Sequence, residues 1–235
     1  MKTLGIWSTL GWALLCFAVA QAVGILIIWM IGQMPTGTTV QYDGRLVALV
    51  TLIPNPVLVV LLAVVAWWRT GGNAAEYLGL VRFSGREFLV GFLAVAALAA
   101  AMDVVSSLAG LDIVSPFQTE SYATARATGW ILPLMLAIIV IGPVGEEVLF
   151  RGFLFRGWIR PGVPGVVAVA VISLLWAALH VQYDPVGMTQ VFLSGLLLGW
   201  IRWRSGSTLL TIVLHLLVNL EATIETAAKI GWSAT

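Results

Sequence analysis

Seven long apolar runs, separated by short polar segments, make up most of the chain. Their approximate limits are residues 4–31, 46–68, 88–108, 130–160, 165–180, 186–203 and 208–228. Well-formed runs approach the roughly 20 residues that a helix needs to cross the hydrocarbon core of a bilayer. The pattern predicts an all-α fold, a polytopic membrane helical bundle with about seven transmembrane helices. Six or eight are the alternatives, because Pro54 and Pro56 interrupt the second run and should kink or break its helix.

The composition agrees with a location in a bilayer. Hydrophobic residues make up 60% of the 235 residues and charged residues only 10%, whereas about a quarter of a soluble globular chain is charged. The length suits a single integral membrane domain, residues 1–235, without a separate soluble module. The net charge of +1 gives no reason to expect nucleic acid as a partner. Cys16 is the only cysteine, so no intrachain disulfide can form.

Lysine and arginine positions predict the orientation in the membrane. With the N-terminus inside, nine of them fall on inner segments and three on outer segments. The inner set is Lys2, Arg69, Arg82, Arg86, Arg151, Arg156, Arg160, Arg202 and Arg204, and the outer set is Arg45, Arg126 and Lys229. We therefore expect a cytoplasmic N-terminus and an external C-terminus. Lys2 and the apolar residues after it imitate a signal peptide, but the apolar run continues so far that we expect a retained helix.

A few polar side chains lie inside the apolar runs, where ionisable groups are costly and indicate function. They are Glu146, Glu147, Arg151, His180, His215 and Asn219. Glu147 and Arg151 are four residues apart, so they share a helix face and are placed to pair. Glu146 points about 100° away from Glu147 and is free to face another group. For the pair of Glu147 and Arg151, a purely structural role is an equally good interpretation.

A turn at residues 161–164 would fold the fourth and fifth runs into an antiparallel hairpin. If the fourth helix extends to Arg160, Glu146 and His180 lie at the same level, about 25 Å from the turn. His180 then ends its helix at membrane depth, and residues 182–187 should form a short loop sunk into the protein. Irregular backbone at that depth is tolerated where it is buried or lines a wet cavity, which a hydrolytic site needs.

These residue types fit hydrolysis of an amide bond. A carboxylate beside an imidazole, Glu146 with His180, can hold and deprotonate a water. His215 and Asn219 share a face of the last run and could donate hydrogen bonds to a developing oxyanion. A zinc ion held by Glu146, His180 and His215 is the alternative, although the H-E-x-x-H signature is absent. The residues alone do not separate these two chemistries, but no serine or cysteine is paired by sequence with a histidine, which disfavours a covalent nucleophile.

Three segments resemble motifs of the CPBP intramembrane proteases, which include CAAX-processing prenyl endopeptidases and bacteriocin-processing and immunity proteins. The motifs are Glu146-Glu147-x-x-x-Arg151, Trp176-x-x-x-His180, with Trp where Phe is common, and His215-x-x-x-Asn219. The similarity covers residues 143–219, the family-like core of the domain.

The resemblance implies an endopeptidase of the CAAX-processing type that acts on a membrane-associated peptide or lipidated protein. It implies Glu146 as the base, assisted by His180, with His215 and Asn219 as oxyanion stabilisers. Glu147 and Arg151 match supporting positions, and we interpret Trp176 as a core residue or a wall of the pocket. The analogy favours a mechanism without a cofactor, with one zinc ion as the alternative. We expect the protein in the cytoplasmic membrane of a prokaryote.

Two other functions are compatible with such a chain. One is a non-catalytic immunity or scaffold protein of the same fold, and the other is a proton-coupled transporter. A scaffold need not retain Glu146, His180, His215 and Asn219 together, and a transporter would more often show inverted repeats, which are not apparent. The sequence does not indicate an oligomeric state.

The remaining polar and small residues have structural interpretations. We expect Asn55 and Asp103 to lie at a kink or an interface, and Glu221 and Glu225 to lie at a solvated helix end. Gly195 and Gly199 form a small-xxx-small pair that predicts close helix packing, although incidental glycines are an equal alternative.

Overall fold

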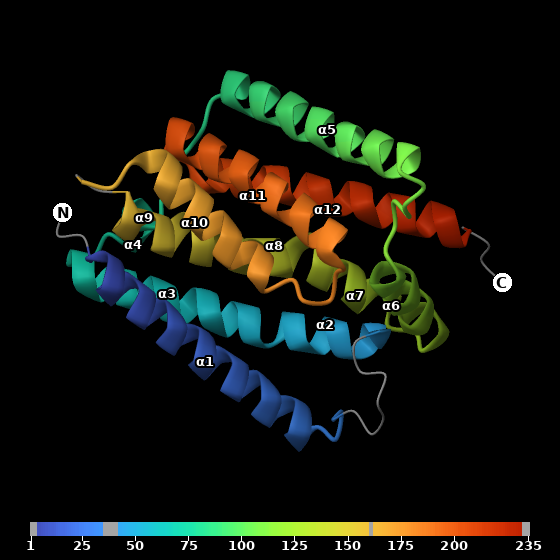
Figure 1. Cartoon of the computed structure of the whole chain (residues 1–235). Helices are drawn as coiled ribbons and strands as arrows, with labels where there is room; N and C mark the ends of the chain where they lie inside the picture. The colour runs from blue at the N-terminus through green and yellow to red at the C-terminus, as the bar shows by residue number, and fades with distance from the viewer. Residues whose placement is uncertain (1–3, 35–41, 160–161, 232–235) are drawn as a thin grey trace.

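The computed structural model describes residues 4–34, 42–159 and 162–231, and within these residues the fold is an all-α bundle (Figure 1). Lys2 and Arg160, two of the basic residues used to predict orientation, lie outside the described residues. The helical segments are α1 (Ile6–Met30), α2 (Gly44–Leu52), α3 (Pro54–Thr70), α4 (Ala74–Tyr77), α5 (Gly85–Leu108), α6 (Pro116–Ala127), α7 (Ile131–Leu136), η2 (Ala137–Ile141), α8 (Gly142–Glu147), η3 (Val148–Leu154), α9 (Phe155–Trp158), α10 (Gly165–Ala178), α11 (Pro185–Ser205) and α12 (Thr208–Ile230).

In the part of the chain that the structure describes, each of the seven apolar runs is mostly helical. Within the described residues, five helical stretches are long and apolar enough to cross a membrane: α1, α2 with α3, α5, α7 to α9, and α12. Helix α1 begins at one end of the bundle, and α12 ends at the opposite end (Figure 1). The other two runs form α10 and α11, which pack against each other. With 14 residues, α10 is about 21 Å long, shorter than the roughly 30 Å hydrocarbon core.

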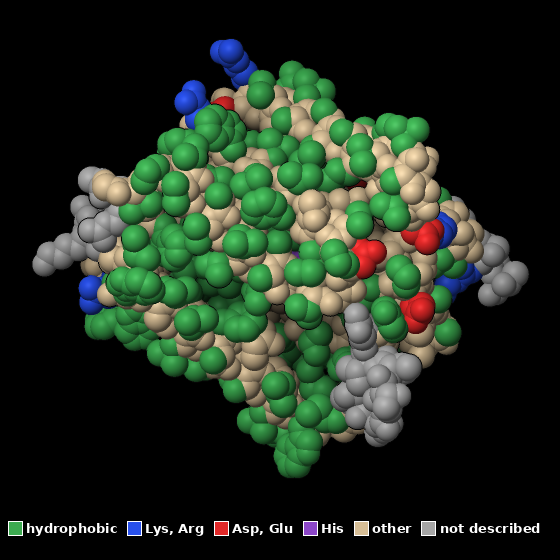
Figure 2. Space-filling view, in the orientation of Figure 1, with side chains coloured by type: hydrophobic (Ala, Val, Ile, Leu, Met, Phe, Trp, Pro, Cys, Tyr) green, Lys and Arg blue, Asp and Glu red, His purple; other side chains and the backbone are tan. Residues whose placement is uncertain are grey.

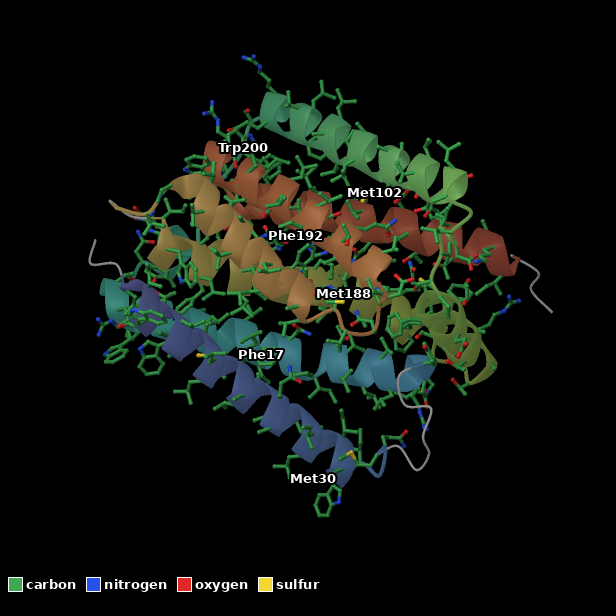
Figure 3. All side chains as sticks on the ribbon, viewed as in Figure 1. Phe17, Met30, Met102, Met188, Phe192 and Trp200 are labelled. Carbon is green, nitrogen blue, oxygen red and sulfur yellow. The ribbon has the colours of Figure 1, made fainter. Side chains whose placement is uncertain are left out.

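The hairpin of α10 and α11 does not run the full length of the bundle. Its connecting loop lies well short of the end at which α12 terminates (Figure 1). Figure 3 shows Trp200, Phe192 and Met188 in this order along α11, from the end near the start of α5 towards that loop. The loop therefore lies at an intermediate level of the bundle, as the hairpin argument predicts.

Two details of the predicted hairpin are wrong. The helix that carries the two glutamates ends at Trp158 rather than at Arg160, because the backbone is already extended at Ile159 and prolines follow at 161 and 164. The loop also lies three residues earlier than the predicted 182–187, at residues 179–184, since Asp184 caps α11 by accepting a hydrogen bond from the Gly187 amide at 2.8 Å. Pro at the first helical position then fixes the start of α11. The outer side of the loop is exposed at Val181.

Helix α6 was not predicted, because residues 111–128 are polar and carry no apolar run. Ser115 forms a capping box with Gln118: the serine hydroxyl accepts from the Gln118 amide, and Gln118 accepts from the Ser115 amide at 2.9 Å. Pro116 occupies the first turn. This S-P-x-Q pattern is a recognised helix start and could have indicated the helix.

The kink predicted at the prolines of the second run is confirmed. Pro54 ends α2 and starts α3. The side chain of Asn55 donates to the Thr51 carbonyl at 3.0 Å, which satisfies a backbone group that the break would leave without a partner. Asn55 therefore belongs to the kink, as expected.

The glycines of α11 pack closely against α10. A Cβ built on Gly195 would lie 3.0 Å from the Cβ of Ser173 and 3.0 Å from Cε3 of Trp176, and one on Gly199 would lie 3.0 Å from Val169. The small-xxx-small prediction is confirmed, and this packing fixes where α10 places Trp176.

Replacing Gly195 by Leu is expected to destabilise the protein by about 1–3 kcal/mol, because the added side chain overpacks the α10–α11 contact. The matched control is Gly11→Leu, since a Cβ on Gly11 in α1 meets nothing within 4 Å. Thermal unfolding of the purified proteins in one detergent measures both. Equal unfolding temperatures for the two variants would contradict the predicted contact.

The molecular surface agrees with a bilayer environment. Hydrophobic side chains cover most of the face in Figure 2, and charged side chains lie mainly towards the two ends. Helix α5 is the least enclosed of the five long stretches, with 11% of its most apolar window buried. The helices therefore present their apolar side chains outward, as a membrane protein does.

Candidate active site

The adjacent glutamates of α8 are flanked on both sides by π-helical turns, η2 and η3. Such turns are rare and occur often at functional sites. In η2 the Ile138 carbonyl accepts from Nδ2 of Asn219 at 2.7 Å. In η3 the Arg151 carbonyl accepts from Nε of Arg202 at 2.9 Å. The two turns thus connect the central helix to α12 and α11.

Glu146 faces α10, where it meets the second motif. Its Oε2 accepts a hydrogen bond from the indole N–H of Trp176 at 2.6 Å. Nε2 of His180 lies 4.0 Å from the same oxygen. Both side chains are partly exposed, Glu146 at 32% and His180 at 17%. The structure therefore brings Glu146 and His180 to one level, as the hairpin argument predicts.

The surroundings of His180 fix which of its ring nitrogens carries the proton in the neutral form. Nδ1 lies 2.9 Å from the Trp176 carbonyl oxygen, which can only accept, so Nδ1 donates. The lone pair of Nε2 is then free on the side of Glu146. Two acceptors 4.0 Å apart suit one bridging water that donates a hydrogen to each, which is the geometry a base needs.

Glu147 faces α12 and is fully buried. One of its oxygens, Oε1, accepts from Nη1 of Arg151 at 2.9 Å and from Nδ1 of His215 at 3.0 Å. The predicted pairing of Glu147 with Arg151 is confirmed, but His215, which the zinc alternative placed beside Glu146, binds Glu147 instead. The two carboxylates point in different directions from α8, so Glu146 reaches α10 and Glu147 reaches α12.

Trp176 lies at the centre of the site. Its ring meets His180 and His215 edge-on, with centroids 5.1 and 5.3 Å away, and the Arg151 guanidinium carbon lies 4.3 Å from the ring centre. Contacts of this kind between a cation and an indole are favourable. Trp176 therefore joins the two glutamate systems. The sequence predicted a core residue or a pocket wall, and Trp176 is a buried core residue at 3% exposed. Its linking position could not be read from the sequence.

Asn219 lies one helical turn after His215 on α12. Its amide nitrogen carries two N–H groups, and one of them is used by the Ile138 carbonyl at 2.7 Å. Asn219 also lines a cavity of about 100 Å³ together with Tyr183. The third motif is therefore split, with His215 bound to Glu147 and Asn219 facing the cavity.

Sequence reasoning missed Tyr183 and Phe117. The Tyr183 ring lies nearly parallel to that of His180, with centroids 6.1 Å apart, and Phe117 of α6 meets Tyr183 edge-on at 5.8 Å. The one signal in the sequence was the position of Tyr183, three residues after His180 in a short loop.

The predicted zinc ligands do not form a set that would hold a metal in the arrangement seen. Within the described residues, the acidic, histidine or cysteine donors that gather within 4.8 Å of one another are Asp103, Glu221 and Glu225. Glu146, His180 and His215 are not such a group, and Nδ1 of His215 is bound to Glu147. Asp103 meets Glu221 and Glu225 between α5 and α12.

Comparison with known proteins gives two matches. The model of a family described as type II CAAX prenyl endopeptidase Rce1-like matches residues 128–220. An Escherichia coli protein described as an uncharacterized 24.3 kDa protein is 33% identical over 167 residues, which cover 68% of this chain and 73% of that protein. No solved structure matches. The residues matched by the family contain all three predicted motifs.

Proposed function

Because the chain belongs to the CPBP family of intramembrane proteases, we propose that it hydrolyses a peptide bond by means of a water activated by Glu146 and His180. At the level of the family, the activity is that of a peptidase embedded in the membrane. The observation that carries the finer proposal is the 4.0 Å between Oε2 of Glu146 and Nε2 of His180.

The first step of the proposed reaction is the attack of water. Glu146 removes one proton while Nε2 of His180 holds the second hydrogen, and the hydroxide adds to the carbonyl carbon. Trp176 keeps the Glu146 carboxylate in place through the hydrogen bond of 2.6 Å. A group fixed in this way loses little orientation in the reaction.

The oxyanion that forms needs hydrogen-bond donors. We assign this role to His215, because the Glu147 carboxylate that accepts from its Nδ1 at 3.0 Å orients the ring, and Nε2 donates when the ring carries both protons. A buried carboxylate acts on an imidazole in this way in serine proteases. The second N–H of Asn219 is the other candidate donor. When the tetrahedral intermediate collapses, the C–N bond breaks and the proton held by Glu146 passes to the leaving amine.

We propose a substrate that presents its peptide bond at membrane depth. Glu146 and His180 are partly exposed. His180 belongs to the loop that joins α10 and α11, and this loop lies away from the ends of the bundle (Figure 1). CAAX-type processing of a lipidated protein is the more specific form of this proposal and rests on the family description. The N-terminus is proposed to lie in the cytoplasm.

The test of the proposed function compares membranes that contain the wild-type protein with membranes that contain Glu146→Gln. Proteomic analysis of peptide ends should find at least one membrane protein with a new C-terminus only in the presence of the wild-type protein. Identical sets of ends in the two membranes would count against a protease.

Removal of divalent metals is expected to leave cleavage unchanged, because Glu146 and His180 can activate water without one. The measurement is the rate of peptide cleavage after dialysis against a strong chelator, with metal analysis of the same sample. A zinc peptidase treated in parallel shows that the chelation was complete. Loss of activity with recovery on addition of zinc would reverse the assignment.

A further inference from the structure

A cavity of about 100 Å³ lies beside the candidate active site, between α6 and α12, which are neighbours at one end of the bundle (Figure 1). Tyr183 and Asn219 line it near the site, and Thr226 lines it seven residues further along α12. Seven helical residues span about 10 Å. The cavity therefore extends about 10 Å from the site, a distance comparable to one substrate residue with its side chain.

Two of the residues that line the cavity also belong to the candidate active site. Tyr183 packs with its ring almost parallel to that of His180, and the Asn219 amide is held by the Ile138 carbonyl, which belongs to another lining residue. A peptide whose carbonyl lies between His180 and Asn219 would have a neighbouring side chain at the entrance of this cavity.

The interior contains one polar group that is ready for a ligand. Ser121 of α6 lines the cavity and is 4% exposed, and within the described part of the chain its hydroxyl has no hydrogen-bond partner. The hydroxyls of Thr223 and Thr226 instead donate to backbone carbonyls of their own helix. A buried polar group without a partner is unfavourable. An occupant that forms a hydrogen bond with Ser121 should therefore bind more tightly than one that does not.

The size and charge of the cavity limit the occupant. A cavity of about 150 Å³ in another protein holds one benzene ring, so about 100 Å³ excludes phenylalanine and tryptophan side chains. None of the residues that line it is charged, which disfavours an ionised side chain.

We propose that this cavity is the subsite for one substrate side chain within a residue of the scissile bond. It accepts uncharged side chains up to the size of valine, and it prefers serine and threonine because they can bond to Ser121. The inference rests on the proposed protease function.

The test uses a randomised library of synthetic peptides that share one apolar membrane anchor, with the full-length protein in detergent. In the first arm, mass spectrometry of the products gives the residues around each cleaved bond for wild type and for Ser121→Leu, which fills the cavity. In the second arm, immobilised Glu146→Gln and Glu146→Gln/Ser121→Leu retain peptides without cleaving them, so binding is read without activity.

The expected result is enrichment of serine, threonine and valine at one position for the wild-type cavity. Ser121→Leu should shift that position to glycine and alanine, by about tenfold or more, since one methylene in a pocket changes discrimination by about 10- to 200-fold. Ala222→Val narrows the cavity from the opposite wall and gives the same shift if Ser121→Leu fails to fold. Glu120→Leu is the matched control on an exposed neighbour in α6.

The two proposals can fail separately. Cleavage that needs Glu146 but has the same profile in wild type, Ser121→Leu and Ala222→Val overturns the subsite and leaves the protease. A shift in the binding arm without cleavage by the wild-type protein supports the subsite and overturns the protease. Absence of any retained peptide in the binding arm, or an equal shift in Glu120→Leu, overturns the subsite.

Discussion

Glu146→Gln is expected to lower the rate of peptide cleavage about 100- to 10,000-fold, the usual contribution of a general base. Glutamine has the same shape, and its amide oxygen can still accept the hydrogen bond from Trp176, which spans 2.6 Å in the wild-type protein. The fold should therefore survive, and only the ability to remove a proton from water is lost. Cleavage of a fluorogenic peptide in detergent measures the rate, and thermal unfolding measures the stability.

The matched control is Glu120→Gln, the same change at an exposed position of α6, which should keep full activity. His180→Ala provides a second check, because Glu146 and His180 are proposed to hold one water. Groups that act as a unit are not additive, so the double variant should be little worse than Glu146→Gln. Full activity of Glu146→Gln, or additive losses in the double variant, would contradict the shared-water mechanism.

Arg151→Met is expected to destabilise the protein by about 3–5 kcal/mol, because it leaves the Glu147 carboxylate buried without its strongest partner. Glu147 and Arg151 are 0% and 1% exposed, and their charged atoms are 2.9 Å apart. Arg151 also donates to the Gly195 carbonyl at 3.3 Å and stacks on Trp176. Thermal unfolding of the purified protein in detergent measures the loss.

Arg69→Met is the matched control, because Arg69 is exposed and its guanidinium lies over the Trp68 ring. Surface substitutions of this kind stay within about 0.5 kcal/mol. The double variant Glu147→Gln/Arg151→Met removes both charges and should recover part of the stability. An unfolding temperature of Arg151→Met close to that of Arg69→Met would show that the ion pair contributes little to stability.

The chain's hydrophobic pattern was sufficient to predict the helices that carry the site. The runs around Glu146, His180 and His215 are long, and a helix has a fixed rise per residue. This is why the sequence could predict that Glu146 and His180 lie at the same distance from the turn at residues 161–164. The calculation needed no knowledge of the rest of the fold, because the two helices are consecutive in the chain.

The partners of each glutamate could not be predicted in the same way. Whether His215 meets Glu146 or Glu147 depends on how α12 is rotated against α8, and these helices are far apart in sequence. That rotation is set by contacts such as Asn219 with the Ile138 carbonyl of η2. The pattern of apolar residues does not reveal the π-helical turns η2 and η3, because it indicates a helix but not where its hydrogen-bond spacing changes.

The sequence by itself determined an all-helical membrane protein, its family motifs and the polar residues that lie inside its apolar runs, because burial of apolar surface and the cost of charge in a bilayer act residue by residue. The tertiary structure alone decided that Glu146 reaches His180 and Trp176, that Glu147 holds Arg151 and His215, and that α6 closes a small cavity beside Asn219. Those contacts depend on the packing of helices that are distant in the chain, and local sequence carries no record of their relative rotation.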